Sequence, residues 1–132
     1  GTRSLLVCPA WPPYTFDHHQ KTYGTDQRMQ EDIWSVEEPS NMFWFGDSVH
    51  YDGPGVPGEQ VFYVQPVGRT PDREIHARHP GGANIGFVDG HAETMSGTRI
   101  RTELGSTAKK RKGWAHPKGW NYVTKDGVFI PR

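Results

Sequence analysis

The pair Asp89-Gly90 stands between two runs that have the composition of β-strands, Ala83–Val88 and His91–Met95. Asp-Gly is a favoured pair for a type I′ turn, because both central residues of that turn need a positive φ. Two strands joined by so short a turn must pair antiparallel as neighbours. The pattern therefore predicts a β-hairpin, and with it at least one antiparallel sheet.

A two-residue turn also predicts the register of this hairpin. Val88 is expected to pair with His91, and Phe87 with Ala92. Side chains alternate between the two faces of a strand, so one face of the hairpin is expected to be apolar and the other polar. The core-facing side would carry Ile85, Phe87 and Ala92, and the opposite side His91 and Glu93.

Composition favours a fold of sheet and loops. Only 33% of the residues are hydrophobic and 12% are aromatic, while sixteen are Gly and eleven are Pro. A chain so poor in aliphatic side chains depends on a few large rings for its core. We expect a single domain over residues 1–132, of the α+β class and dominated by an antiparallel sheet with at most one or two short helices.

Other segments have the pattern of single elements. Asn41–Gly46 is almost wholly apolar and is expected to be a central strand, buried on both faces. Apolar residues recur at helical spacing up to Val36, which predicts a short helix with Thr25 or Asp26 as its N-cap. Further strands are expected at Ser4–Cys8, Gln60–Gln65, and in a terminal hairpin of Trp120–Thr124 and Gly127–Ile130.

The charge balance and the lack of known catalytic motifs reduce the classes of function that this sequence suggests. The fifteen basic and fifteen acidic residues cancel, so no overall field attracts nucleic acid. The sequence contains no Gly-x-Ser-x-Gly elbow and no His-Glu-x-x-His pair, and its single cysteine, Cys8, lies between an apolar run and a proline. We therefore expect a protein that is not an enzyme.

Residues that can bind a metal gather around the predicted hairpin. Asp47, His79, Asp89 and His91 offer carboxylate and imidazole ligands, and the sequence leaves a divalent metal as the one candidate cofactor. The alternative is structural: His79 could fold back toward Asp47 and form a hydrogen bond that ties three segments together. Exposed rings give a different candidate, a surface on which sugars stack, formed by Trp11, Tyr14, Trp114 and Trp120.

Three segments resemble a known bacterial family. The segment from His79 to His91, with Gly81-Gly82 near its start and nine residues between His79 and Asp89-Gly90, resembles the His-x9-Asp-Gly motif of prepilin-like, or pseudopilin-like, proteins. Leu6–Pro9 resembles the Cys-Pro segment of that family, and Phe45–Ser48 its strand that ends in Asp-Ser. The resemblance covers residues 5–95, and residues 96–132 are expected to be a C-terminal extension.

The resemblance implies a non-enzymatic structural subunit of a type II secretion-like or type IV pilus-like assembly in the cell envelope. Members carry a leader and a long apolar helix anchored in the inner membrane, so these residues would be the exported globular head. Its partners would be other pilin-like subunits or secretion components. An exposed apolar groove is expected where that helix packs, lined by Ile85, Phe87 and either Phe43 or Phe45.

Two alternatives remain open at this stage. The aromatic residues would suit a carbohydrate-binding or other extracellular binding module. The His79, Asp89 and His91 set would suit a metal-dependent hydrolase.

Overall fold

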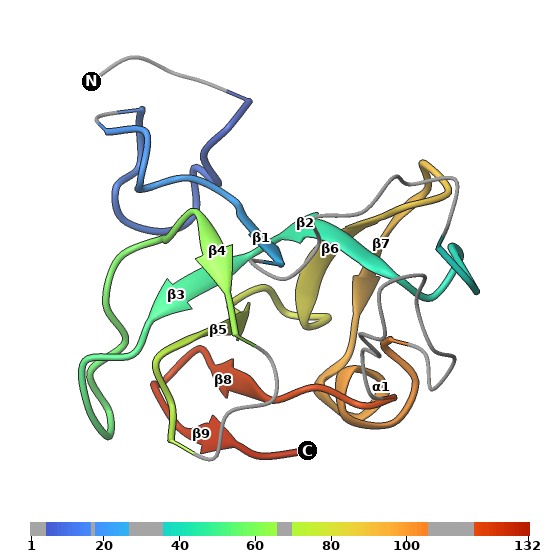
Figure 1. Ribbon diagram of the computed structural model, residues 1–132. Helices are drawn as coiled ribbons and strands as arrows, with labels where there is room; N and C mark the ends of the chain where they lie inside the picture. Colours follow the sequence, from blue (N-terminus) through green and yellow to red (C-terminus); the bar gives the residue numbers. More distant parts are fainter. Residues whose placement is uncertain (1–4, 17, 27–35, 66–69, 106–117) are drawn as a thin grey trace.

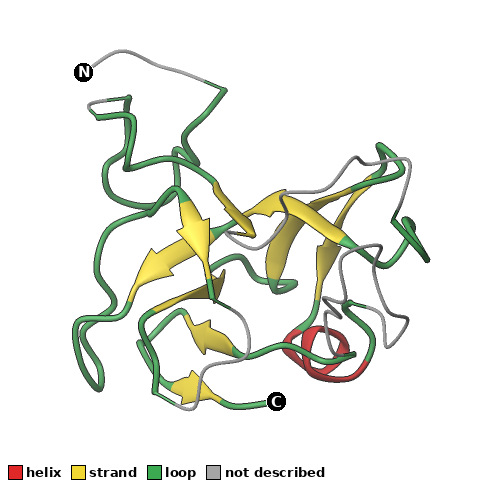
Figure 2. Ribbon diagram, in the orientation of Figure 1, coloured by secondary structure: helices red, strands yellow, loops and turns green. Residues whose placement is uncertain are grey.

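The computed structural model describes residues 5–16, 18–26, 36–65, 70–105 and 118–132. These form two mixed β-sheets and one short helix, so the predicted α+β class with dominant sheet is confirmed (Figures 1 and 2). The elements are β1 (Gly24–Asp26), β2 (Phe43–Gly46), β3 (Ser48–His50), β4 (Tyr63–Val64), β5 (Arg73–Ala77), β6 (Ala83–Phe87), β7 (Ala92–Met95), α1 (Gly97–Thr102), β8 (Tyr122–Thr124) and β9 (Phe129–Ile130).

The first sheet has the strand order β4-β1-β2-β6-β7, with β2 at its centre as predicted. All of its neighbouring strands pair antiparallel except β1 and β4, which run parallel. The expectation that β2 is buried on both faces is wrong, because Trp44 and Phe45 are both more than 40% exposed. The register against β6 shifts between Phe43 and Phe45, and such a bulge turns side chains out of the regular alternation.

The β6–β7 hairpin forms, but its predicted register is wrong by one residue. Gly86 pairs with Ala92, and the Phe87 amide donates to the His91 carbonyl at 2.8 Å. The loop therefore holds three residues, and only its last, Gly90, has a positive φ, of 93°. This is the geometry of a three-residue hairpin loop that ends in a left-handed glycine, not of a type I′ turn.

The slipped register changes which side chains share a face. Ile85 stands opposite Glu93, and Phe87 stands opposite His91, with their rings stacked at 4.2 Å between centroids. Ala92 lies on the other face and is exposed. The expected grouping of Ile85, Phe87 and Ala92 on one face is thus corrected.

The second sheet has the order β3-β5-β8-β9. The terminal hairpin predicted from the sequence is present as β8 and β9, and β8 joins the sheet by running parallel to β5. The predicted strand Gln60–Gln65 is reduced to β4 at the edge of the first sheet.

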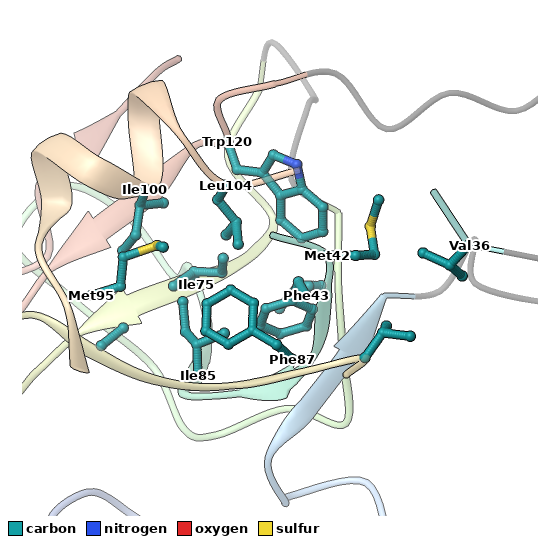
Figure 3. Close-up of a cluster of buried hydrophobic side chains, with 13 residues drawn as sticks. Val36, Met42, Phe43, Ile75, Ile85, Phe87, Met95, Ile100, Leu104 and Trp120 are labelled. Atoms are coloured by element: carbon teal, nitrogen blue, oxygen red, sulfur yellow. The ribbon is translucent and has the colours of Figure 1, made fainter. Parts of the chain in front are cut away.

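A core of buried side chains lies between the sheets and α1 (Figure 3). Phe43 contributes from β2 and Ile75 from β5, so both sheets share it. Trp120, which precedes β8, is fully buried, and its ring lies 5.3 Å from that of Phe43. Other members include Met42, Ile85, Phe87, Met95, Ile100 and Leu104.

The strand predicted at Ser4–Cys8 is wrong, because Leu5–Cys8 forms turns. Thr25 lies inside β1 and so does not cap a helix, whereas Asp26 ends β1 directly before residues 27–35, and these residues of the predicted helix lie outside the described residues. The helix that is observed, α1, begins after Ser96, whose hydroxyl accepts the Arg99 amide at 3.3 Å. Within the described ranges, no helix has the length and apolarity needed to cross a membrane.

Candidate functional site

Asp47 occupies the single position between β2 and β3, where the chain passes from one sheet to the other. Its side chain is fully buried, and its Oδ2 accepts the Asn84 amide at 2.7 Å. Its own amide donates to the Asn84 carbonyl, and its carbonyl accepts the His76 amide, both at 3.0 Å. Backbone from each sheet therefore fixes the carboxylate at the seam between them.

His79 reaches this seam from a tight turn that follows β5. The His79 and Gly82 backbones exchange two hydrogen bonds of 2.9 Å, which makes the predicted Gly81-Gly82 turn. Gly82 has a φ of 128°, and a Cβ at this position would overlap the Met95 carbonyl. The turn directs the His79 ring inward, so that its Nε2 lies 3.2 Å from Asp47 Oδ2.

Cys8 arrives from the N-terminal segment and completes a group of three. The side chain of Gln60 holds this segment: its Oε1 accepts the Cys8 amide, and its Nε2 donates to the Cys8 carbonyl, both at 2.9 Å. Cys8 Sγ then lies 3.5 Å from His79 Nε2. Ligand-type atoms of Cys8, Asp47 and His79 all lie within 4.8 Å of one another.

Arg78 supplies the counter-charge for the buried carboxylate. Its Nε lies 3.7 Å from Asp47 Oδ1, both side chains are fully buried, and its Nη2 donates to the Ser48 carbonyl. Burial lowers the pKa of the Arg78 guanidinium, and burial is also the main cause that raises the pKa of the Cys8 thiol. The thiol is therefore protonated in this arrangement, and Asp47 Oδ1 accepts no hydrogen bond from any described residue.

The geometry does not favour a thiol nucleophile. In a Cys-His-Asp relay the two ring nitrogens of the histidine contact the cysteine and the carboxylate separately. Here Nε2 of His79 faces both Cys8 and Asp47. A raised thiol pKa further lowers the fraction of nucleophilic thiolate.

The four residues predicted as a metal set are divided between two places. Asp47 and His79 meet at the seam, whereas Asp89 and His91 pair with each other in the exposed loop beyond the opposite end of β6. Over the part of the chain that is described, the only set of three metal-capable residues within 4.8 Å is that of Cys8, Asp47 and His79. The His79, Asp89 and His91 cluster of the hydrolase alternative does not form.

No family model, curated protein or solved structure matches this chain.

Of the aromatic residues predicted to stack on sugars, the three that the structure describes do not gather on one surface. Trp120 belongs to the core, and Trp11 turns inward, with its Nε1 donating to the Gly58 carbonyl at 2.9 Å and its ring edge on to His76. Tyr14 is exposed, and Trp114 lies outside the described residues. No sugar platform follows from this arrangement.

An apolar groove does occur, but with a lining different from the predicted one. Ile85, Phe87 and Phe43 are buried in the core, and of the four expected residues only Phe45 lines the groove. Leu5 is 97% exposed and Leu6 58% exposed, and both lie along it. The remaining apolar lining comes from Tyr23, Trp44 and Phe62. We call this surface the N-terminal groove.

Sequence reasoning missed two residues of the seam, Cys8 and Arg78. An isolated cysteine beside a proline carries no catalytic pattern, so the sequence alone does not indicate Cys8. The available sign was its place in the Cys-Pro segment of the family resemblance. Arg78 stands directly before His79, and nothing in the sequence pattern distinguishes it from an exposed arginine.

Proposed function

We propose that this protein is a non-enzymatic, pseudopilin-like structural subunit of a type II secretion-like or type IV pilus-like assembly in the cell envelope. The observation that carries this proposal is the meeting of Cys8, Asp47 and His79 within 4.8 Å. Each of these residues comes from a different one of the three segments that resemble the family. Segments far apart in sequence that share a family pattern are expected to support one another in the fold.

The N-terminal groove gives a second, independent reason. A sheet-dominated head that packs on an apolar helix must present an apolar surface to it. The exposed side chains of Leu5, Leu6, Trp44 and Phe45 provide such a surface, and it lies beside the N-terminal segment. We assign this groove to the apolar helix of a pilin-like subunit.

The proposal is tested by cross-linking in the producing cell. A photoreactive amino acid at Phe45, in the N-terminal groove, is expected to capture pilin-like subunits or secretion components, identified by mass spectrometry. The matched control carries the same amino acid at Val128, which is 52% exposed between β8 and β9.

Capture of such partners at Phe45 and not at Val128 would support the assembly role. Capture of soluble cytoplasmic enzymes at Phe45, or the same set of proteins from both positions, would contradict it. The N-terminus of the native polypeptide gives a further check, because a prepilin-type product is cleaved and methylated at an apolar segment.

A further inference from the structure

We propose that Cys8, Asp47 and His79 bind a single divalent transition-metal ion of the zinc class. This site does not depend on the assembly role, because it follows from the seam alone. Three different kinds of ligand atom, a sulfur, a carboxylate oxygen and an imidazole nitrogen, already converge there from three separate segments.

The distances between these atoms fit one tetrahedral ion. With Zn–S bonds of about 2.3 Å and Zn–N or Zn–O bonds of about 2.0–2.1 Å, tetrahedral angles place sulfur and nitrogen about 3.5 Å apart, and nitrogen and oxygen about 3.3 Å apart. Cys8 Sγ lies 3.5 Å from His79 Nε2, and that nitrogen lies 3.2 Å from Asp47 Oδ2. The third pair, Cys8 Sγ and an Asp47 carboxylate oxygen, lies within 4.8 Å, and these two atoms would adjust their separation to share the ion.

The His79 ring nitrogen cannot serve both of its neighbours in this cluster with one hydrogen bond. His79 Nε2 has one proton or one lone pair, yet it faces two partners, Cys8 and Asp47. One cation would satisfy the sulfur, the nitrogen and the oxygen together.

Neighbouring residues hold the three ligands in position, as is usual for metal ligands. The Asn84 amide fixes the Asp47 carboxylate at Oδ2, and Arg78 lies on its other oxygen. Gln60 fixes the backbone of Cys8, and the turn closed by Gly82 fixes that of His79. The fold therefore already orders the ligands, so metal binding would lose little further conformational entropy.

The chemical types of these three ligands determine which class of metal ion the site would bind. Thiolate and imidazole favour zinc and related ions over Mg²⁺ or Ca²⁺, which prefer oxygen ligands. The His79 side chain is 23% exposed, whereas that of Asp47 is fully buried, so the site opens to solvent on its histidine side. A water molecule is expected to take the fourth position there. When the metal binds, the Cys8 S–H bond breaks, the proton goes to solvent, and a sulfur–metal bond forms.

A Co²⁺ titration tests the site, because thiolate-bound Co²⁺ has a charge-transfer absorption in the near ultraviolet. The wild-type protein, first stripped with a chelator, is expected to bind one equivalent with this absorption, and Zn²⁺ should displace it. Cys8→Ser should abolish the absorption and weaken Zn²⁺ binding at least about 100-fold, since changes to outer-shell partners alone cost about 10–100-fold. His79→Ala should weaken binding similarly.

His91→Ala is the matched control, because His91 is an exposed histidine remote from the seam, and it should bind as the wild type does. No charge-transfer absorption in the wild type at saturating Co²⁺ would overturn the proposal, as would Cys8→Ser binding Zn²⁺ as tightly as the wild type. If Cys8→Ser does not fold, the wild type decides: Zn²⁺ should raise its melting temperature and protect its thiol from alkylation, and failure of both refutes the site. That failure would leave the Phe45 cross-linking result unaffected.

Discussion

At the scale of single residues, Glu74 on β5 is a carboxylic acid in an interior position. Its side chain is fully buried, with Oε1 accepting the Asp72 amide at 3.3 Å and Oε2 without a hydrogen-bond partner among the described residues. Burial is the main cause that raises its pKa to about 8, and the nearby Asp72 carboxylate raises it further. Glu74 is therefore expected to be protonated in the folded protein at neutral pH.

A raised folded-state pKa gives the stability a definite dependence on pH. The contribution of Glu74 is fully present below its unfolded pKa of 4.5 and is lost as the pH rises toward about 8. Glu74→Gln keeps the shape and the acceptor but cannot ionise. We expect this variant to match the wild type near pH 4 and to exceed it at pH 8 by on the order of 3 kcal/mol in free energy of unfolding. Thermal melts at both pH values, with exposed Glu59→Gln as control, measure this, and an equal difference at both would contradict it.

His76, two residues along the same strand, shows the opposite behaviour. Burial and the Arg78 charge lower its pKa to about 3, while its Nε2 contacts the Thr124 carbonyl at 3.2 Å. A base with a depressed pKa contributes stability above its unfolded value of 6.5, and this is lost as the pH falls toward about 3. In NMR titrations the His76 ring should stay neutral at pH 5. A His76 midpoint near 6.5 would show that the ring is not desolvated.

At the scale of elements, two glycine turns position the site and the hairpin. Gly90 and Gly82 both have a positive φ, but a Cβ on Gly90 would meet no atom within 4 Å, whereas one on Gly82 would overlap the Met95 carbonyl. Gly90→Ala should therefore cost only the backbone strain, about 1–2 kcal/mol. Gly82→Ala should cost at least twice as much in chemical denaturation, because the chain must also move. Equal losses would mean that the His79 turn is not tightly constrained.

The existence of these elements was easier to predict than their register. Asp89-Gly90 and the flanking runs indicated the hairpin, because turn chemistry is local. The choice of a three-residue loop depends on remote contacts, since the Val88 amide donates to Met42 and the Asp89 amide to Pro39. The bulge that exposes Trp44 and Phe45 in β2 likewise depends on pairing with β6. No pattern within a single strand specifies such contacts.

The candidate site could be predicted only in part, because it too depends on contacts between segments that are remote in the sequence. The contact between His79 and Asp47 was one of two readings of the sequence, because both residues adjoin predicted strands and a turn. Cys8 joins them only through Gln60, whose side chain bridges 52 positions of sequence. Asp89 and His91 are near His79 along the chain, yet the length of β6 separates them from it in the fold.

At the scale of the whole molecule, Gln60 attaches the N-terminal segment to the sheets. Its Nε2 lies within hydrogen-bond distance of the carbonyls of Cys8, Trp11 and Pro13, and its side chain is buried. Leaving such buried groups without a partner costs about 1–3 kcal/mol. In Gln60→Ala, Cys8 should react with a thiol reagent about tenfold faster or more under native conditions, while Gln20→Ala should react as the wild type does. An unchanged rate in Gln60→Ala would show that other contacts hold the segment.

Because β5 pairs in parallel with β8, the second sheet can form only after the C-terminal part of the chain has been made. Synthesis delivers the polypeptide from its N-terminus, but the second sheet needs β8, and the shared core needs Trp120. Until Trp120 and β8 have emerged, Phe43 and Ile75 face solvent or a chaperone. The shared core is thus expected to close only after the C-terminal hairpin has been made, and a chain that ends before this hairpin would lack Trp120 from its core.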